Sequence, residues 1–94
     1  MAAYILIKEN QVVWLGTNPQ GGDWLSHVII MPQSKKVGAV TISDGADSLV
    51  IYQGGVLTGD LVPFNIPLDI QSKSNGFKVS TGAGLQVLAI GDFK

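Results

Sequence analysis

Strict alternation of apolar and polar residues runs through Pro63-Phe64-Asn65-Ile66-Pro67-Leu68-Asp69-Ile70. Successive side chains of a β-strand point to opposite faces, so this spacing predicts a strand whose four apolar residues pack on a core. Pro63 and Pro67 share the other face. Because neither has an N–H group to donate, we expect an edge strand, or a strand bent at a bulge. Two prolines also protect such an edge from uncontrolled pairing.

Further runs rich in Val, Ile and aromatic residues flank this segment, and Gly and Pro residues separate them. None has a sustained 3.6-residue period, which predicts an all-β chain. With the alternating segment extended to Val62–Ser72, about eight strands are expected. The other seven are Tyr4 to Lys8, Gln11 to Leu15, Trp24 to Met31, Val37 to Ser43, Ser48 to Gln53, Gly76 to Thr81 and Leu85 to Ile90.

Short turns connect these runs. Glu9-Asn10, Asp44-Gly45 and Asn75-Gly76 are typical of tight hairpin turns, and Thr81 to Gly84 of a looser one. Turns of this kind predict that consecutive strands are antiparallel neighbours. The expected architecture is a single small antiparallel β-sandwich, jelly-roll-like, and its one domain covers residues 1–94.

The composition indicates a subunit of an assembly. The chain has 94 residues, of which 46% are hydrophobic and 14% charged, and it contains no Arg. So few charges leave apolar surface for a partner to cover. There is also no Cys, which excludes disulfides and thiolate chemistry and leaves oligomerisation as the means of extra support.

Charge and hydropathy exclude two classes of partner. The formal net charge of -1 gives no field that attracts nucleic acid or an anionic membrane. The longest apolar runs, such as Val28 to Met31, are too short to span a bilayer, and residues 1–4 lack the basic start of a signal peptide. We expect neither nucleic acid nor membrane as a partner, and synthesis inside a cell.

No residue pattern predicts catalysis. Ser26 and His27 are adjacent on a predicted strand, so they are expected to point to opposite faces and not to act as nucleophile and base. His27 shares its face with Ile29 and Met31, which favours a packed or interfacial histidine. Asp44 to Asp47 fits a turn better than a calcium loop. No catalytic residue, metal site or cofactor is expected.

The candidate contact residues lie around the predicted loop Gly16 to Asp23. This loop is polar and rich in Gly, which fits a surface connection or an ordered loop that docks on a neighbour, and Trp24 follows it directly. The predicted partner-binding residues are Asn18, Pro19, Gln20, Asp23 and Trp24.

Four aromatic residues offer another possibility. Tyr4, Trp14, Trp24 and Tyr52 have the flat rings of a sugar-binding platform. Trp14 lies inside an apolar run and is expected in the core. Trp24 is then the good candidate for sugar stacking, but a core position or a subunit contact is favoured over that role.

Residues 37–91 resemble small β-sandwich virion proteins of tailed bacteriophages, notably head decoration (cement) and fibre-associated proteins. The resemblance rests on Val37-Gly38-Ala39-Val40-Thr41-Ile42-Ser43-Asp44-Gly45, Val62-Pro63-Phe64-Asn65-Ile66-Pro67-Leu68, Gly76-Phe77-Lys78-Val79-Ser80-Thr81-Gly82-Ala83 and Val87-Leu88-Ala89-Ile90-Gly91. It implies a non-enzymatic protein on the capsid surface that binds the major capsid protein or another virion protein, often as a homotrimer, and stabilises capsomer junctions. A carbohydrate-binding module at a tail or fibre tip, or a tail or connector subunit, is the alternative.

Overall fold

The computed structural model describes residues 3–16, 22–73 and 76–93, which form ten β-strands. In chain order they are β1 (Ala3–Ile7), β2 (Val12–Trp14), β3 (Trp24–Pro32), β4 (Lys36–Val37), β5 (Val40–Asp44), β6 (Asp47–Tyr52), β7 (Gly55–Val56), β8 (Phe64–Gln71), β9 (Phe77–Thr81) and β10 (Leu85–Asp92). In the described part of the chain, no helix is long and apolar enough to cross a membrane. The all-β prediction is confirmed.

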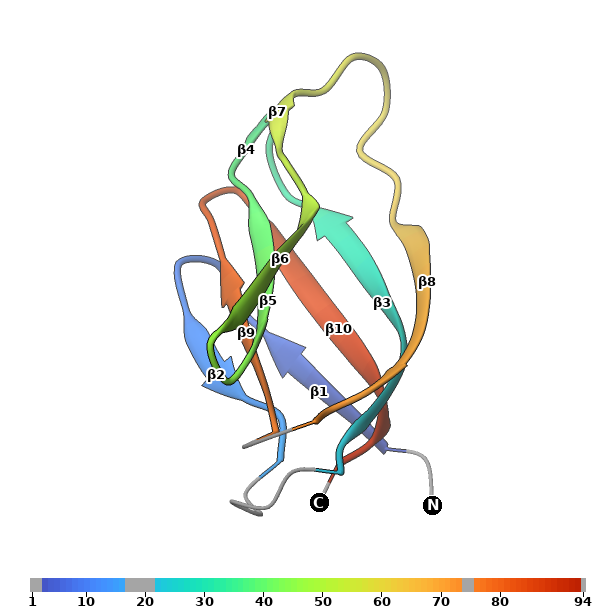
Figure 1. The fold of residues 1–94 in the computed structure, drawn as a ribbon. Coiled ribbons are helices and arrows are strands. Elements are labelled where there is room, and N and C mark those ends of the chain that lie inside the picture. Colours follow the sequence, from blue (N-terminus) through green and yellow to red (C-terminus); the bar gives the residue numbers. More distant parts are fainter. Residues whose placement is uncertain (1–2, 17–21, 74–75, 94) are drawn as a thin grey trace.

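Two four-stranded antiparallel sheets face each other (Figure 1). Sheet A has the strand order β1-β10-β3-β8, and sheet B has the order β2-β9-β5-β6. The short strands β4 and β7 form a separate two-stranded ribbon at one end. Each of the eight predicted strands has a counterpart, although the predicted strand Val37 to Ser43 is divided between β4 and β5.

A close approach of two glycines explains that division. Gly38 lies between β4 and β5, and a Cβ atom added to it would lie 2.7 Å from the Cα of Gly82. Hydrogen bonds hold the two segments together, since Gly38 N donates to Ala83 O over 2.8 Å and Gly82 N to Ala39 O over 2.8 Å. Only residues without side chains allow backbones to come this close.

The predicted pairing of consecutive strands is wrong at three of the four turns. Only β5 and β6 form a hairpin, through Gly45, which has a φ of 63°. The turns after β1 and after β9 each lead from one sheet to the other, and so does the connection from β8 to β9, where Asn75 lies outside the described residues. A turn signal predicts where the chain reverses, but the sheet that the next strand joins depends on packing across the sandwich.

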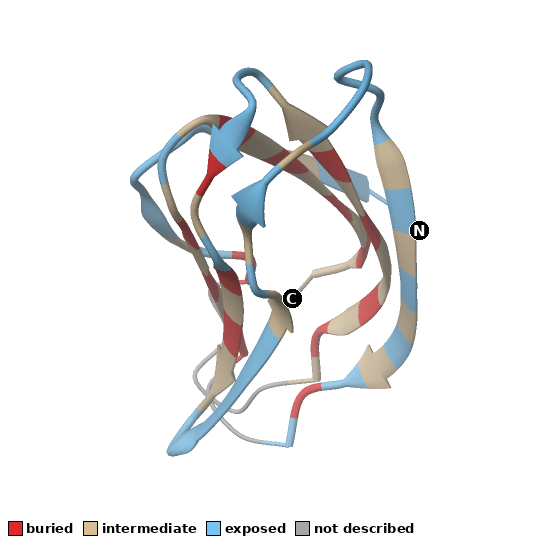
Figure 2. Cartoon of the chain, turned by 90° about the horizontal axis from the view of Figure 1, so that it is seen from above, coloured by how far each residue is buried: buried red, intermediate tan, exposed pale blue. Residues whose placement is uncertain are grey.

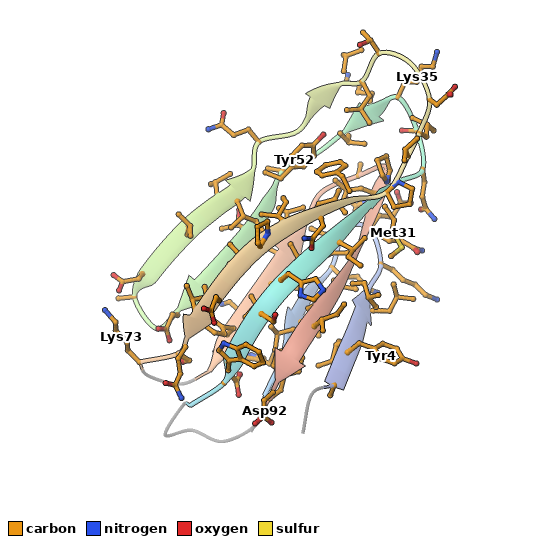
Figure 3. All side chains as sticks on the ribbon, turned by 90° about the vertical axis from the view of Figure 1, so that its right-hand side faces the viewer. Tyr4, Met31, Lys35, Tyr52, Lys73 and Asp92 are labelled. Carbon is orange, nitrogen blue, oxygen red and sulfur yellow. The ribbon has the colours of Figure 1, made fainter. Side chains whose placement is uncertain are left out.

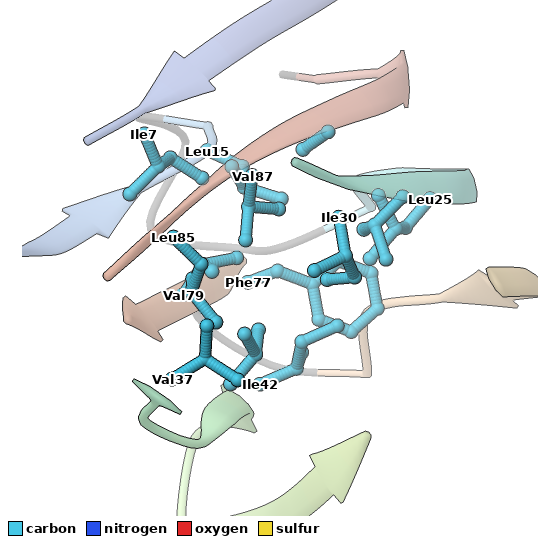
Figure 4. Close-up of a cluster of buried hydrophobic side chains, with 13 residues drawn as sticks. Ile7, Leu15, Leu25, Ile30, Val37, Ile42, Phe77, Val79, Leu85 and Val87 are labelled. Atoms are coloured by element: carbon cyan, nitrogen blue, oxygen red, sulfur yellow. The ribbon is translucent and has the colours of Figure 1, made fainter. Parts of the chain in front are cut away.

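The core fills the space between the sheets. Thirteen buried hydrophobic residues from both sheets and the adjoining segments form one cluster, and Leu25, Ile30, Val79, Leu85 and Val87 are among the fully buried ones (Figure 4). Buried residues occur along the strands of both sheets when the molecule is seen from above (Figure 2), and they alternate with less buried ones along β9 and β10. Each long strand of sheet A therefore has one face in the core and the other on the surface.

The alternating segment forms an edge strand, as predicted. β8 ends the order of sheet A and pairs with β3 alone among the described strands. Along β8, half-buried residues alternate with exposed ones, and Phe64, Ile66, Leu68 and Ile70 are the half-buried set. The pairing of β3 with β8 shifts register between Leu25 and His27, so the strand is also irregular.

Candidate interaction surface

The outer face of sheet A carries an apolar surface that we call the apolar face. Its residues come from alternate positions of β1, β3 and β10. Between them lie core positions, which are buried in β3 and β10, whereas in β1 Ile7 is buried and Ile5 half-buried. Five of them form two rows across the sheet, since Tyr4 is opposite Ile90, and Leu6 is opposite Leu88, which in turn is opposite Ile29. The sixth residue, Met31, is next to these rows and opposite Gln86. The members are Tyr4, Leu6, Ile29, Met31, Leu88 and Ile90.

Exposure differs across the apolar face. Tyr4 is 72% exposed and Leu6 47% exposed, whereas Ile29, Leu88 and Ile90 are half-buried by their neighbours. Tyr4 and Met31 project from this side of the molecule in Figure 3. A shallow hollow of about 220 Å³ lies between β1 and β10, lined by Ala3, Tyr4, Leu88 and Ile90.

Formal charges lie at one end of sheet A. Among the residues of its four strands, the carboxylates of Asp69 and Asp92 carry the formal charges, and no Lys occurs there. Asp92 is at the lower end in Figure 3. The rows of the apolar face are therefore uncharged, which suits burial against a partner because no charge has to lose its hydration.

The outer face of sheet B is different. Its central strands present hydroxyl groups and a cation outward, from Thr41, Ser43, Lys78 and Ser80. Hydroxyl and ammonium groups are well solvated by water. The edge strands of sheet B, however, add exposed apolar side chains, among them Val12 at 61%, Trp14 at 50% and Val50 at 48%. The apolar side chains of sheet B therefore lie along its edges, whereas those of sheet A extend across the neighbouring strands β1, β10 and β3.

Trp14 lies on this second surface, so its predicted core position is wrong. The residue is 50% exposed, and the Nζ atom of Lys78 lies 5.3 Å from the centroid of the Trp14 ring. β2 is an edge strand whose inward position is taken by Val13 instead. The apolar run around Trp14 alternates between core and solvent, as any strand on a sandwich surface does.

The four aromatic residues do not form one platform. Tyr52 packs edge-on against Phe64, with ring centroids 5.3 Å apart, and Trp14 is on the outer face of sheet B. Tyr4 and Trp24 belong to sheet A, but β10 separates their strands. Trp24 therefore does not share a sugar-stacking surface with the other three rings.

Trp24 holds two strands together. Its Nε1 atom donates a hydrogen bond of 2.8 Å to Oδ1 of Asp69, which joins the start of β3 to β8. The ring is half-buried, so part of it is still open to a partner. Of the other predicted contact residues, Asn18, Pro19 and Gln20 lie outside the described residues.

Asp23 is a structural residue. It is 1% exposed, and its Oδ2 atom accepts a hydrogen bond of 3.1 Å from the backbone N of Phe77. Its own carbonyl accepts a hydrogen bond of 2.7 Å from Ser72 N. Gly76, with a φ of 88°, lies against this carboxylate, and an added Cβ would be 2.9 Å from Oδ2. A carboxylate so enclosed closes the end of the sandwich and presents no surface to a partner.

Ser26 and His27 contact each other, contrary to the prediction. The Oγ atom of Ser26 and the Nδ1 atom of His27 are 3.0 Å apart. The reason is the irregular pairing of β3 with β10, in which Ser26 is an extra residue between Leu25 and His27 and interrupts the alternation of faces. His27 lies half-buried on the outer side of sheet A, opposite Ile90 on one side and Pro67 on the other. That position fits the interfacial histidine that the sequence suggested.

Sequence reasoning missed two surface features. Residues 57–63 form a long connection between β7 and β8. Val62 within it is 61% exposed, and Val56 just before it is 75% exposed. A groove of about 290 Å³ also opens between the edge strands β6 and β8, with Leu49, Ile70 and Phe77 in its lining. The run of residues 54–61 between two predicted strands signalled the connection, whereas the groove depends on how the sheets meet.

The described residues contain no cluster of three or more His, Asp or Glu side chains placed to hold a metal ion. The polar contacts of Asp23 at one end of the sandwich serve the fold instead, and so does a second hydrogen-bond network between two turns. Thr81 Oγ1 donates to Lys8 O over 2.6 Å, and Gly84 N donates to Glu9 Oε2 over 2.7 Å, so the turn after β1 is bound to the turn after β9. These polar contacts have a role in the fold, whereas the exposed apolar face has none within a single copy of the chain.

No protein family matches the chain, and no curated protein sequence does. Among solved structures, the chain is similar to a pentameric capsid protein isolated from metagenomic phage sequences, with 13% identity and a TM-score of 0.54 over 98% of this chain and 61% of that one. A second crystal structure of a pentameric capsid protein from metagenomic phage sequences gives a TM-score of 0.49 at 13% identity, over 98% and 62% of the two chains. An exo-β-1,3-galactanase from Phanerochaete chrysosporium, solved with galactose, gives 0.49 at 15% identity, over 96% and 29%.

The first of these similarities shows a shared all-β fold. The chain spans about three fifths of the length of that capsid protein, 61% by alignment.

Proposed function

We propose that this protein is a structural component of a phage virion, a decoration protein that binds the assembled head through the apolar face. The observation that carries the proposal is the apolar face itself, whose rows on the outer side of sheet A are uncharged and where Tyr4 is 72% exposed. A surface of this kind is costly to leave in water and stable against a protein partner. The partner is the major capsid protein or another virion protein, and the protein lies on the capsid surface after synthesis in the host cytoplasm.

The strand order supports this role. Seen as a jelly roll, the eight strands of the two sheets follow one another from sheet to sheet except at the β5–β6 hairpin, with β1-β10-β3-β8 facing β2-β9-β5-β6. Jelly rolls are common in viral capsid proteins and in lectins. The fold shared with a phage capsid protein favours the first group. A decoration protein would act by mass action, because binding only the assembled shell shifts the equilibrium toward it.

Self-association is part of the proposal, with the homotrimer as the stoichiometry that the resemblance to decoration proteins implies. Only 14% of the residues are charged, and low charge density reduces the repulsion between copies. Trp24, half-buried at the edge of the outer side of sheet A, is proposed as an additional contact to the capsid.

A carbohydrate-binding module at a tail or fibre tip is the second candidate. One observation favours it, since the groove between β6 and β8 combines apolar Leu49 and Phe77 with polar groups of Asp47 and Lys73. Sugar-binding sites pair apolar contact surface with polar groups in this way. A glycan array would give a signal that depends on this groove, whereas a decoration protein would give none.

Rebinding to particles that lack the protein tests the proposed function. The variant Ile29→Ser with Leu88→Ser places two hydroxyls in one row of the apolar face, because these residues are opposite each other. The matched control, Val12→Ser with Val50→Ser, makes the same change at exposed positions of sheet B, which are 61% and 48% exposed.

We expect the sheet A variant to lose binding about tenfold or more and the sheet B control to bind like the wild type. Equal binding by both variants would remove the apolar face from the contact. No binding by the folded wild type would reject the decoration role.

A further inference from the structure

The two edges of sheet A differ in their protection against pairing. At β8, Pro67 offers no N–H group, Asp69 has a φ of 49°, and the ladder is irregular. At β1, residues Ala3–Ile7 contain neither a charge nor a proline, and their pairing with β10 runs without a register shift. Edge strands left regular, apolar and uncharged are the ones that accept another strand.

We propose that β1 pairs edge to edge with β1 of a second copy of this chain. Within the described residues β1 has β10 as its only partner strand, so the backbone groups on its other side are open to a new strand. An antiparallel arrangement about a two-fold axis at Ile5 brings all five residues into the pairing. Tyr4 of one copy is then opposite Leu6 of the other, on the outer side of the joined sheets.

A second copy is the occupant because the edge is complementary to itself. It has no charge to repel its own image, and the pairing of Tyr4 with Leu6 is an aromatic–aliphatic contact of the kind that stabilises neighbouring strands. The apolar faces of the two copies also become continuous across the axis, where the hollow beside Tyr4 and Ile90 borders β1. The β1 contact thus covers part of the apolar surface of both copies.

The arrangement is two-fold, since β8 cannot serve as the other half of a head-to-tail contact. Without an N–H at Pro67, a ring formed by adding β1 to β8 of the next copy would lack a hydrogen bond at its centre. The β1 contact therefore gives even-numbered assemblies, and the trimer of the decoration proteins would need a second contact elsewhere. The inference depends on the edge of sheet A alone and holds whether or not the protein binds a capsid.

Charge substitutions at the two outward positions test the pairing and its register. The variant Tyr4→Lys with Leu6→Lys places like charges opposite each other across the axis. The variant Tyr4→Lys with Leu6→Glu places opposite charges there. A control, Val12→Lys with Val50→Lys, adds the same charge as the first variant on the outer side of sheet B, where both residues are exposed. The measurement is the mass in solution, by sedimentation or light scattering, without any particle present.

We expect an even-numbered wild type, a double Lys variant of half that mass, and restoration of the wild-type mass by the Lys–Glu variant, with the control unchanged. The apparent dissociation constant of the double Lys variant should rise by about tenfold or more, because like charges directly opposite each other destabilise a strand pair. Amide hydrogen exchange should show that all of β1 is protected in the wild type. This measurement tests the β1 pairing even if the double Lys variant fails to fold.

A monomeric or odd-numbered wild type would overturn the inference. So would a double Lys variant that keeps the wild-type mass, or fast exchange of the β1 edge in a folded oligomer. If the Lys–Glu variant failed to restore the mass, the register centred on Ile5 would be rejected.

Discussion

The indole of Trp24 donates a hydrogen bond of 2.8 Å to the carboxylate of Asp69, and this bond joins β3 to the edge strand β8. The contact lies beside the bulge between Leu25 and His27, where the register of the two strands shifts. Asp69 has a φ of 49°, in the left-handed region. Aspartate tolerates that conformation better than most residues. One residue thus serves both the bent backbone and the side-chain bond.

Substitutions at Asp69 should separate these two roles. We expect Asp69→Ala to destabilise the fold by about 1–2 kcal/mol, because it removes the acceptor and places a less tolerant residue at positive φ. Asp69→Asn keeps an acceptor and the tolerance, so it should cost less than half of that. Asp69→Gly relieves the backbone but not the lost bond, and should fall between. Urea unfolding followed by tryptophan fluorescence measures all three, and three equal values would contradict the assignment.

The buried carboxylate of Asp23 should matter more for stability than for binding. Asp23→Ala leaves the N–H of Phe77 without this acceptor, and we expect a loss of about 1–3 kcal/mol. Gly76→Ala should also destabilise, since alanine is strained at a φ of 88° and its Cβ would meet the carboxylate. Thermal melts by circular dichroism give the values. If Asp23→Ala left the melting temperature unchanged, the closing role of this carboxylate would be wrong.

The edge strand gives a test of the core. Ile66 and Leu68 are half-buried and pack against the core cluster, whereas Asn65 is exposed. We expect Ile66→Ala and Leu68→Ala to cost about 1–3 kcal/mol each, below the range of fully buried sites, and Asn65→Ala to cost under about 0.5 kcal/mol. Denaturant melts decide. The reverse order, with Asn65 the sensitive position, would reverse the facing of β8.

Much of the fold was predictable from local patterns. The alternation in residues 63–70 predicted the edge strand and its buried face, because a two-residue period leaves one arrangement against a core. The strand pairing was not predictable. The turns Thr81 to Gly84 and Glu9-Asn10 show where the chain reverses, but they do not indicate which sheet the next strand joins. The bulge at Ser26 could not be predicted either, because it depends on the register of β3 with Ile90 and Gly91 of β10.

The candidate surface was predictable in part. The run Val28 to Met31 is apolar at every position, so a strand there has apolar side chains on both faces, and the structure places Ile29 and Met31 on the outer side of sheet A. The same signal in β1, where Tyr4 and Leu6 alternate with core residues, was overlooked. Which strands lie side by side, and so whether such residues form one surface, is decided by long-range pairing that composition does not contain.

Trp24 offers a test of the proposed capsid contact. We expect Trp24→Ala to weaken binding to particles that lack the protein by about tenfold or more, in line with aromatic anchors at interfaces. Trp24→Phe keeps an apolar ring but loses the N–H donor, so it should bind nearly as well and should lose about as much stability as Asp69→Gly, which also lacks only the hydrogen bond. Binding and circular dichroism are measured on the same samples. If Trp24→Ala bound as well as the wild type, the contact would lie elsewhere.

An image reconstruction of the virus particle that carries this protein tests the central claim most directly. We predict density for the sandwich at many regularly spaced positions on the outside of the head, with the outer side of sheet A against a neighbouring protein. Density confined to a tail, a fibre or a connector, or an apolar face turned to the solvent at every position, would contradict the account.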